Sequence, residues 1–546
     1  MGEGKVGQAE LADYRHPLPV LQAQGSRGRG WIAEACSVPK NAQTLPGELA
    51  AAHAMPLSLT APGSVAPLQR WPFHCRATGA MRPLFLPTQP NAHALVAVGA
   101  VRPSLSKLAV ITVGRAGGRW GRCSSMTQRY PIRPIAPEEF EAYCDAALEA
   151  FNEAERHAEF IEHERRIFEF DRSLAAFDGD AIVGTAAVDS FQLTVPGGVV
   201  GAGGVTFVSV LPSHRRRGIL SAMMRHQLAD IAARGEPVAA LYASESVIYG
   251  RYGYGCASGQ LSLTIRRGEG ALTPATAASA GAGDGPVRLR GGQPADLRTE
   301  LAKVYDSALP HRPGMIARDE RWWEAVLDDP EFERRGMSPY KCLLASDDSG
   351  PRGYAVYRTK PDWDDDGLPY GRLSVRELIA ADGAATAALW ADLLTRDLIG
   401  ETTAWQRPVD DPLLDMLADR RRARAYLTDG LWIRLIDVPA ALRGRRYNCA
   451  IDVVLEVTDE LLAANAGRWR LQCPGPGDGR AVSCERTTAA PDVTLPVATL
   501  GAGYLGGARL GALATAGLIT EHSKGAVAML SAAMYSDPAP WCPSNF

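Results

Sequence analysis

One strand-to-helix turn constrains this chain more than any other feature. Residues 204–211 (GVTFVSVL) are β-branched and apolar, which predicts a buried strand. Pro212 ends the strand, and a helix from Gly218 to about Ala233 follows a loop with three consecutive arginines, residues 215–217. Three arginines oppose the positive end of the helix dipole, which is unfavourable unless an anion binds there. The turn therefore predicts an anion site more readily than a solvated basic turn.

Two familiar phosphate-binding motifs are absent from this turn. It lacks the Gly-x-x-x-x-Gly-Lys-Ser/Thr of a P-loop and the Gly-x-Gly-x-x-Gly of a dinucleotide-binding fold.

The formal net charge of −3 gives no global case for a nucleic acid or an anionic membrane. No apolar run approaches the roughly 20 residues of a membrane span, and no signal peptide is recognisable. The ten cysteines and ten histidines show no metal-ligand spacing, so no metal is predicted.

The first 125 residues differ in composition from the rest. They carry 13 basic and 5 acidic residues, with no Asp or Glu in 51–125, whereas residues 126–546 carry 45 basic and 56 acidic residues. This Pro-, Gly- and Arg-rich segment can bury little apolar surface, so we expect disorder or only loose local structure. It is either a basic tail for a nucleic acid or sequence upstream of a true start at Met126. The dispersed charges favour the second interpretation, and we expect residues 1–125 to be dispensable.

From residue 126 onward the pattern is that of a folded α/β protein in three units. Residues 126–268 form the first unit, with a helix over 160–170, a hairpin turn at 178–180 and a last strand over 259–266. Residues 269–286 are small and polar, which is typical of a linker. Residues 287–437 repeat the same order of elements. Residues 438–546 combine strands with Gly- and Ala-rich apolar helices.

The anion turn resembles the pyrophosphate loop of the GNAT acetyltransferases, in which Arg/Gln-x-x-Gly-x-Gly/Ala follows the fourth strand. Arg215-x-x-Gly218 fits, and Leu220 replaces the final small residue. With TFVSVLPSHRRRGIL, PVAALYASESVIYGRYGYG and the terminal Phe, the chain from about residue 129 to 546 closely resembles the enhanced-intracellular-survival (Eis) family. The resemblance implies an α/β (α+β) fold: two tandem GNAT-like domains with mixed central sheets, then a sterol-carrier-protein-like domain. The second is expected to be degenerate, because its turn at 380–384 lacks arginine and carries Asp382.

The family resemblance also implies an acetyl-CoA-dependent N-acetyltransferase, in which an amine attacks the thioester and a thiolate leaves. Its implied cofactor-binding residues are Val208, Ser209, Val210, Arg216, Arg217, Gly218, Ile219, Leu220, Ser221, Ser244 and Glu245. Tyr249 matches the general acid of the family. A free tyrosine has a pKa near ~10, a little above an alkyl thiol, so proton transfer to sulfur is expected to be close to balanced. The alternative for Tyr249 is a packing role in a Tyr-rich turn.

The family's general base is the terminal carboxylate, which here belongs to Phe546. A solvated α-carboxyl has a pKa of ~3.3–3.7, and a closed pocket would raise it. The aromatic, uncharged end of the chain favours burial over the fraying that is usual at termini. Asn545 departs from the family, which often has an acid there. Phe151 and Glu153 correspond to the amine pocket, although Glu153 is equally plausible as a solvated acid.

Three functions compete. The first is acetylation of a small-molecule cationic amine, such as an aminoglycoside, a polyamine or a lysine side chain, with which the net charge of −11 over residues 126–546 agrees. The second is a non-catalytic lipid or small-ligand binding protein, with the apolar C-terminal helices lining a groove. The third, an aminoacyl transferase using charged tRNA, lacks a basic stripe after Met126. The scattered cysteines favour reduced thiols in the cytoplasm. The charge balance and the lack of a membrane span predict no nucleic-acid or membrane partner. The resemblance further implies a homo-oligomer, a hexamer.

Overall fold

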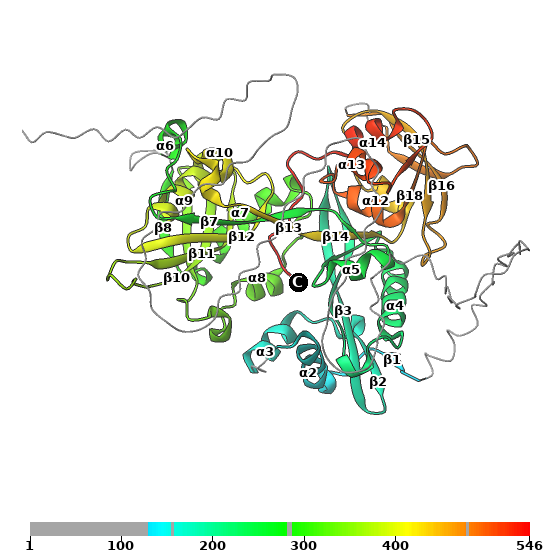
Figure 1. Ribbon diagram of the computed structural model, residues 1–546, viewed down its shortest axis with the longest axis horizontal. Helices are drawn as coiled ribbons and strands as arrows, with labels where there is room; N and C mark the ends of the chain where they lie inside the picture. Colours follow the sequence, from blue (N-terminus) through cyan, green and yellow to red (C-terminus); the bar gives the residue numbers. More distant parts are fainter. Residues whose placement is uncertain (1–128, 154–157, 281–286, 477–479) are drawn as a thin grey trace, which may run out of the picture. The chain divides into compact units, whose positions relative to one another are not determined.

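The computed structural model describes residues 129–153, 158–280, 287–476 and 480–546 (Figure 1). These residues belong to one compact unit. The extension predicted over residues 1–125 lies outside the described residues. Helices and strands are both abundant, which confirms the predicted α/β class, and the strands form three sheets. Among the described residues, no helix combines the length and the apolar character that crossing a bilayer needs.

The first sheet has seven strands in the order β1-β2-β3-β4-β5-β14-β6. They are β1 (Ile132–Arg133), β2 (Leu174–Asp178), β3 (Ala181–Val195), β4 (Gly198–Val210), β5 (Val238–Tyr242), β6 (Gly255–Cys256) and β14 (Leu431–Leu435). β2 and β3 form the predicted hairpin, and Gly179 at its turn has a φ of +64°, which glycine adopts without strain. β3 and β4 pair antiparallel over almost their whole lengths, so they form the centre of the sheet.

Helices cover both faces of the first sheet (Figure 1). They are α2 (Phe140–Phe151), α3 (Ala158–Ile167), α4 (Ile219–Ala233) and α5 (Ser246–Tyr249). Phe140 of α2 shares a core with Ala187 of β3, whereas Met224 of α4 shares another core with Val188, the next residue of that strand. Because successive residues of a strand point to opposite faces, two separate cores sandwich the sheet. The helix predicted over 160–170 ends earlier and is followed by a 3₁₀ turn, Phe170–Arg172.

The second sheet also has seven strands, in the order β13-β7-β12-β11-β10-β9-β8. They are β7 (Gly259–Arg266), β8 (Arg288–Gly292), β9 (Lys341–Asp347), β10 (Gly350–Lys360), β11 (Gly371–Ala380), β12 (Ile399–Pro408) and β13 (Tyr426–Asp429). The helices of this region are α6 (Pro274–Ala280), α7 (Arg298–Ala308), α8 (Glu320–Leu327), α9 (Gly383–Thr395) and α10 (Leu413–Met416).

The first two sheets exchange strands. β7, expected as the last strand of the first unit, pairs with β12 and β13 in the second sheet. β14, from the end of the second unit, pairs with β5 and β6 in the first sheet. The strand predicted over 259–266 is therefore present but lies in the other sheet, because an apolar pattern predicts a strand and not its partner. Backbone hydrogen bonds consequently tie the two units together.

The segment predicted as a linker, 269–286, is partly structured. α6 lies within it and contacts α9. Leu272 also forms an isolated β-bridge with Leu417. Residues 281–286 lie outside the described residues. The described part of segment 269–286 is therefore structured and is not the flexible linker that its composition predicts. The predicted domain boundaries stay predictions.

The third sheet has the order β17-β16-β15-β18-β19. Its strands are β15 (Ile451–Thr458), β16 (Gly467–Cys473), β17 (Ser483–Arg486), β18 (Val493–Pro496) and β19 (Thr520–Glu521), with helices α11 (Val438–Arg443), α12 (Val497–Tyr504), α13 (Leu510–Thr515) and α14 (Ala526–Met534). A Cβ on Gly501 of α12 would lie 2.3 Å from the Ile433 carbonyl oxygen of β14. A Cβ on Gly255 of β6 would lie 1.9 Å from the Ala498 carbonyl oxygen. These glycines therefore allow close packing of α12 on the first sheet.

Candidate active site

The predicted anion loop joins β4 to α4. β4 ends at Val210, a 3₁₀ turn follows over Pro212–His214, and α4 begins at Ile219. Arg216 and Gly218 both have positive φ angles, of +62° and +82°. A positive φ is unfavourable for arginine, and such conformations cluster at functional sites. Turns of this kind direct backbone N–H groups to one side and make an anion-binding concavity.

The first turn of α4 offers unpaired backbone N–H groups. No side chain caps the helix at Gly218, and the Ala222 N–H donates to the Gly218 carbonyl. The N–H groups of Ile219, Leu220 and Ser221 precede this bond and have no intrahelical partner. Together with the dipole of a four-turn helix they attract a negatively charged group such as a diphosphate.

The three arginines of the loop have different environments. Arg217 donates to the Tyr130 hydroxyl at 2.7 Å, and Arg215 donates to the Ala150 carbonyl at 3.4 Å. Arg216 is exposed, and no described residue forms a hydrogen bond or ion pair with its side chain. Arg217 therefore braces the loop against the first strand region, whereas Arg216 is available to a ligand.

β4 and β5 separate next to this loop. Their parallel pairing ends at Gly204 and Ala240. A bulge follows at Phe207, which has a φ of +54°. The predicted cofactor residues of β4, which are Val208, Ser209 and Val210, lie beyond the point of separation. The hydrogen bonding between β4 and β5 is therefore interrupted at the place where the family resemblance predicts the cofactor.

Two serines among the predicted cofactor-binding residues form hydrogen bonds with other side chains through their hydroxyls. The Ser209 and Thr185 hydroxyls are 2.7 Å apart, and Ser209 is buried. The Ser221 hydroxyl is 3.0 Å from that of Tyr252, in the 3₁₀ turn after α5. Ser209 can therefore contribute to a ligand site through its backbone, while Ser221 links α4 to the turn that follows Tyr249.

Tyr249 ends the short helix α5, shortly after β5. Ser244 and Glu245 precede this helix and are exposed. Tyr249 is 5% exposed, and burial raises the pKa of its phenol to about 12, with Glu245 and Tyr252 adding to the shift. No described residue forms a hydrogen bond with its hydroxyl. Tyr249 therefore keeps its proton at neutral pH and has that proton free to donate.

The C-terminal residues are folded into the protein. Cys542 and Ser544 are buried, and the Cys542 carbonyl accepts a hydrogen bond from the Tyr242 hydroxyl at 3.0 Å. The ring of Phe546 lies edge to face with those of Phe191 in β3, at 4.8 Å between centroids, and Tyr242 in β5, at 5.5 Å. The last residue of the third domain therefore contacts the first sheet, as a terminal carboxylate base requires.

The residues predicted for the amine pocket lie at the end of α2. Phe151 is 43% exposed, Glu153 is exposed, and Asn152 between them ends the helix with a φ of +60°. No ring contact or hydrogen bond joins either side chain to Phe546, and residues 154–157 lie outside the described residues. The structure therefore does not bring these two residues against the terminal residue, and their assignment stays a prediction.

Sequence reasoning missed one acidic residue near Phe546. Asp189 lies two residues before Phe191 on β3 and is 5% exposed, yet no described residue forms a hydrogen bond or ion pair with its side chain. Burial raises the pKa of Asp189 well above its usual value, the nearby Glu169 and Glu164 raise it further, and Arg172 and Arg321 oppose the shift. Burial also raises the pKa of Glu164, on α3, to about 7. The available signal was a single charge within the apolar strand 181–195.

The equivalent turn of the second unit is occupied by the protein's own acid. Asp382 caps α9, where its carboxylate accepts the Ala385 N–H at 2.9 Å. Arg352 donates to the same carboxylate at 3.0 Å. The backbone N–H groups at the N-terminus of α9 are therefore satisfied by an anionic side chain, whereas those at the N-terminus of α4 are open to an external anion.

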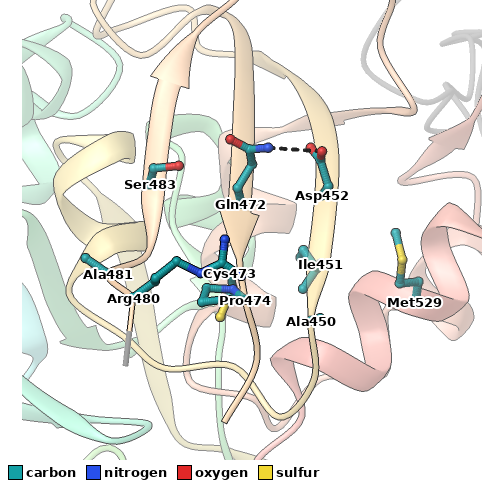
Figure 2. A pocket seen from close by; sticks show the side chains of 10 residues that line it. All are labelled: Ala450, Ile451, Asp452, Gln472, Cys473, Pro474, Arg480, Ala481, Ser483 and Met529. Atoms are coloured by element: carbon teal, nitrogen blue, oxygen red, sulfur yellow. Dashed lines mark hydrogen bonds between the residues drawn. The ribbon is translucent and has the colours of Figure 1, made fainter. Parts of the chain in front are cut away.

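A separate pocket of about 530 Å³ lies in the third domain, beside the ends of β15, β16 and β17 and helix α14 (Figure 2). Its lining residues are Ala450, Ile451, Asp452, Gln472, Cys473, Pro474, Arg480, Ala481, Ser483 and Met529. Gln472 donates to Asp452 at 3.0 Å, and Arg470 pairs with the same carboxylate at 2.6 Å. None of these lining side chains is both buried and without a hydrogen-bond partner. The lining therefore does not by itself identify a class of ligand.

Comparison with known proteins identifies the three domains. Models of a GNAT acetyltransferase domain match residues 131–257 and 314–435, and a sterol carrier protein domain matches residues 438–543. These matches confirm the predicted fold class. They also show an acetyltransferase, and the GNAT domains imply acetyl-CoA as its co-substrate.

Whole-chain relatives point the same way. An uncharacterized N-acetyltransferase of Streptomyces avermitilis is 42% identical over 416 residues, which cover 76% of this chain and 99% of the relative. The crystal structure of Eis1 from Mycobacterium abscessus is similar with a TM-score of 0.64 and 33% identity, over 76% of this chain and all of the other. The N-acetyltransferase Eis of Mycobacterium tuberculosis is 37% identical over 66% of this chain and 84% of its own length. The chain therefore belongs to the Eis family of GNAT N-acetyltransferases.

Proposed function

We propose that this enzyme transfers the acetyl group of acetyl-CoA to primary amines of cationic substrates, such as aminoglycosides, polyamines or lysine side chains. The observation that carries the proposal is the open N-terminus of α4 behind the Arg216–Gly218 loop. It combines unpaired N–H groups, a free guanidinium and a glycine in the left-handed conformation. These donors suit the diphosphate of coenzyme A, and the acid at Asp382 makes the second unit unsuitable for it.

The rest of the proposed co-substrate site follows the same strands. Bound acetyl-CoA supplies a thioester carbonyl that an amine can attack. The separation of β4 from β5 after Gly204 leaves strand backbone groups without a ladder partner, which can orient the pantetheine and the carbonyl. Ser244 and Glu245, exposed after β5, are proposed at the edge of this site. Arg217, already bonded to Tyr130, would hold the loop in shape.

Two residues are proposed to move protons. The terminal carboxylate of Phe546 would take a proton from the attacking amine, and the packing of the Phe546 ring against those of Phe191 and Tyr242 supports this role. Tyr249 would donate a hydrogen bond or its proton to the departing sulfur. Phe546 contacts Tyr242, the last residue of β5, and Tyr249 ends the helix that follows this strand.

The preference for a cationic amine is supported by two acids, Asp189, which is buried, and Glu164, which is half-buried. Asp189 lies on β3 between Ala187 and Phe191, which share its strand face. No described residue forms a hydrogen bond or ion pair with its carboxyl group, although Arg172 and Arg321 are near enough to act against the rise in its pKa. A cation beside a buried carboxylate offsets the cost of burying its charge. We propose that Asp189 and the nearby Glu164 attract the ammonium groups of the substrate. We also propose a homohexamer, from the family resemblance, and a cytoplasmic location, from the scattered cysteines.

The first experiment is a thiol-release assay with acetyl-CoA against a panel of polyamines, aminoglycosides and lysyl peptides. Turnover with at least one polycation, and none with a neutral amine of similar size, is expected. Absence of turnover with every cationic amine would contradict the proposal.

A second experiment compares a protein with a C-terminal histidine tag and one with an N-terminal tag. Extra residues after Phe546 would displace the carboxylate, so kcat/KM should collapse in the first protein only. Acetyl-CoA binding should survive in both proteins, because the loop that joins β4 to α4 is unchanged. Equal activity would remove the terminal carboxylate from the mechanism and leave Glu245 or a water chain as the base.

A further inference from the structure

The second domain contains a fully buried ion pair between Arg318 and Glu377. The Arg318 Nη1 and Nη2 groups donate to the two carboxylate oxygens at 3.1 and 2.6 Å, and the side chains are 0% and 3% exposed. The Tyr305 ring lies 4.0 Å from the guanidinium carbon, and the Tyr354 hydroxyl donates to Glu377. Removing two charges from water costs free energy that their attraction need not repay. A contribution to stability is therefore not a sufficient reason for this ion pair.

Arg318 has a further partner in the C-terminal tail. Its Nε and Nη2 donate to the hydroxyl of Ser544 at 3.1 and 2.9 Å, and Ser544 is completely buried. Ser544 lies two residues before the terminal Phe546. Two donors from one edge of the guanidinium converge on the serine oxygen, while Glu377 holds the other edge.

The segment 313–318, which ends in this arginine, bridges the first sheet and the tail. Its Ala317 N–H donates to the Gln192 carbonyl of β3 at 2.9 Å. Its Pro313 carbonyl accepts the Trp541 N–H at 2.8 Å. The backbone before the arginine is therefore fixed to β3, the strand that also carries Phe191, while the arginine side chain holds the tail.

We propose that Arg318, oriented by Glu377, is a positioning residue that sets the location of the Phe546 carboxylate through Ser544. The inference rests on the proposed function, in which that carboxylate takes the amine proton. Chain ends are ordinarily mobile, whereas a general base must lie within hydrogen-bond reach of the proton it removes. The degenerate second domain would thus serve the chemistry of the first, although its own anion turn is closed by Asp382.

Ser544→Ala is the test, because it removes one oxygen and leaves the Arg318–Glu377 pair in place. A small displacement of a reacting group can cost about 100-fold in rate, so we expect kcat to fall about 10- to 100-fold. The KM for acetyl-CoA should stay within about two-fold, since the α4 loop is distant in the chain and unaltered. The matched control is Ser258→Ala, another buried serine, whose hydroxyl accepts the Leu431 N–H at 2.9 Å. It should lower the melting temperature without lowering kcat.

A double-mutant comparison separates this inference from the proposed base. Ser544→Ala is combined with the C-terminal tag, which already displaces the carboxylate. If Ser544 acts through the carboxylate, the substitution should add no further loss to the tagged protein. A tag that abolishes activity, together with a Ser544→Ala kcat near wild type, would overturn the positioning role and spare the base. Additive losses would also overturn it. A tag without effect would overturn the base, and the positioning role with it.

Discussion

Tyr249→Phe tests whether the phenol proton assists departure of the thiolate. The change removes one oxygen that no described residue hydrogen-bonds, and it keeps the ring, whose centroid lies 6.1 Å from that of Tyr254. The free energy of unfolding should therefore change by no more than about 0.5 kcal/mol, which corresponds to a shift of roughly one or two degrees in Tm. A loss of activity in this variant would then report on chemistry and not on folding.

The structure sets the size of the expected loss. A thiol has a pKa of ~8.5, whereas burial raises the pKa of Tyr249 to about 12. A difference of roughly 3.5 units makes complete proton transfer to a thiolate uphill by about 5 kcal/mol. Proton transfer from phenol to thiolate, which is close to balanced for a free tyrosine, is therefore unfavourable for Tyr249. A hydrogen bond to the developing charge is favoured instead, and we expect kcat to fall ~10²-fold, the lower end of the usual range.

The assay is kcat against pH at saturation with both substrates, for the wild type and for Tyr249→Phe. Because the folded pKa is about 12, the wild type should lose no activity through tyrosine ionisation below about pH 10. Glu245→Gln should move the alkaline loss to lower pH, since the Glu245 carboxylate helps to raise the pKa of Tyr249. A kcat of Tyr249→Phe within a few-fold of wild type would show that this tyrosine is only structural. An alkaline loss below pH 9 that the substitution abolishes would refute the argument from burial.

Three further predictions concern binding. Arg216→Glu should raise the KM for acetyl-CoA about 10- to 100-fold, because it replaces a free guanidinium in the loop with a carboxylate, while the KM for the amine changes little; equal effects on both would contradict the assignment. Calorimetric titration with acetyl-CoA should give one site per chain, because Asp382 caps α9, and two sites would refute a degenerate second domain. Asp189→Asn should raise the KM for a polycationic amine about 10-fold and also raise Tm at pH 7. The folded pKa of Asp189 is raised, so its contribution to stability is present below the unfolded pKa of ~3.9 and is lost as pH rises through the folded value. A lower Tm, or an unchanged KM, would show that Asp189 has a structural role.

The amino-acid sequence alone determined those features that depend on neighbouring residues. The apolar run, the proline and the arginines specify the β4–loop–α4 turn, because strand, turn and helix preferences are local. The absence of arginine and the presence of Asp382 likewise predicted that the second turn repels a pyrophosphate. The structure adds that Asp382 caps α9. The aromatic end of the chain predicted burial of the tail from its composition.

Contacts between distant segments were decided only by the tertiary structure. An alternating pattern does not say which sheet a strand joins, so the exchange of β7 and β14 between the sheets could not be predicted. Asp189 appeared in the sequence as one charge in a strand, and its isolation depends on what surrounds it after folding. The bond from Arg318 to Ser544 joins residues 226 positions apart. Side-chain partners at such separations are set by packing, and no local preference encodes them.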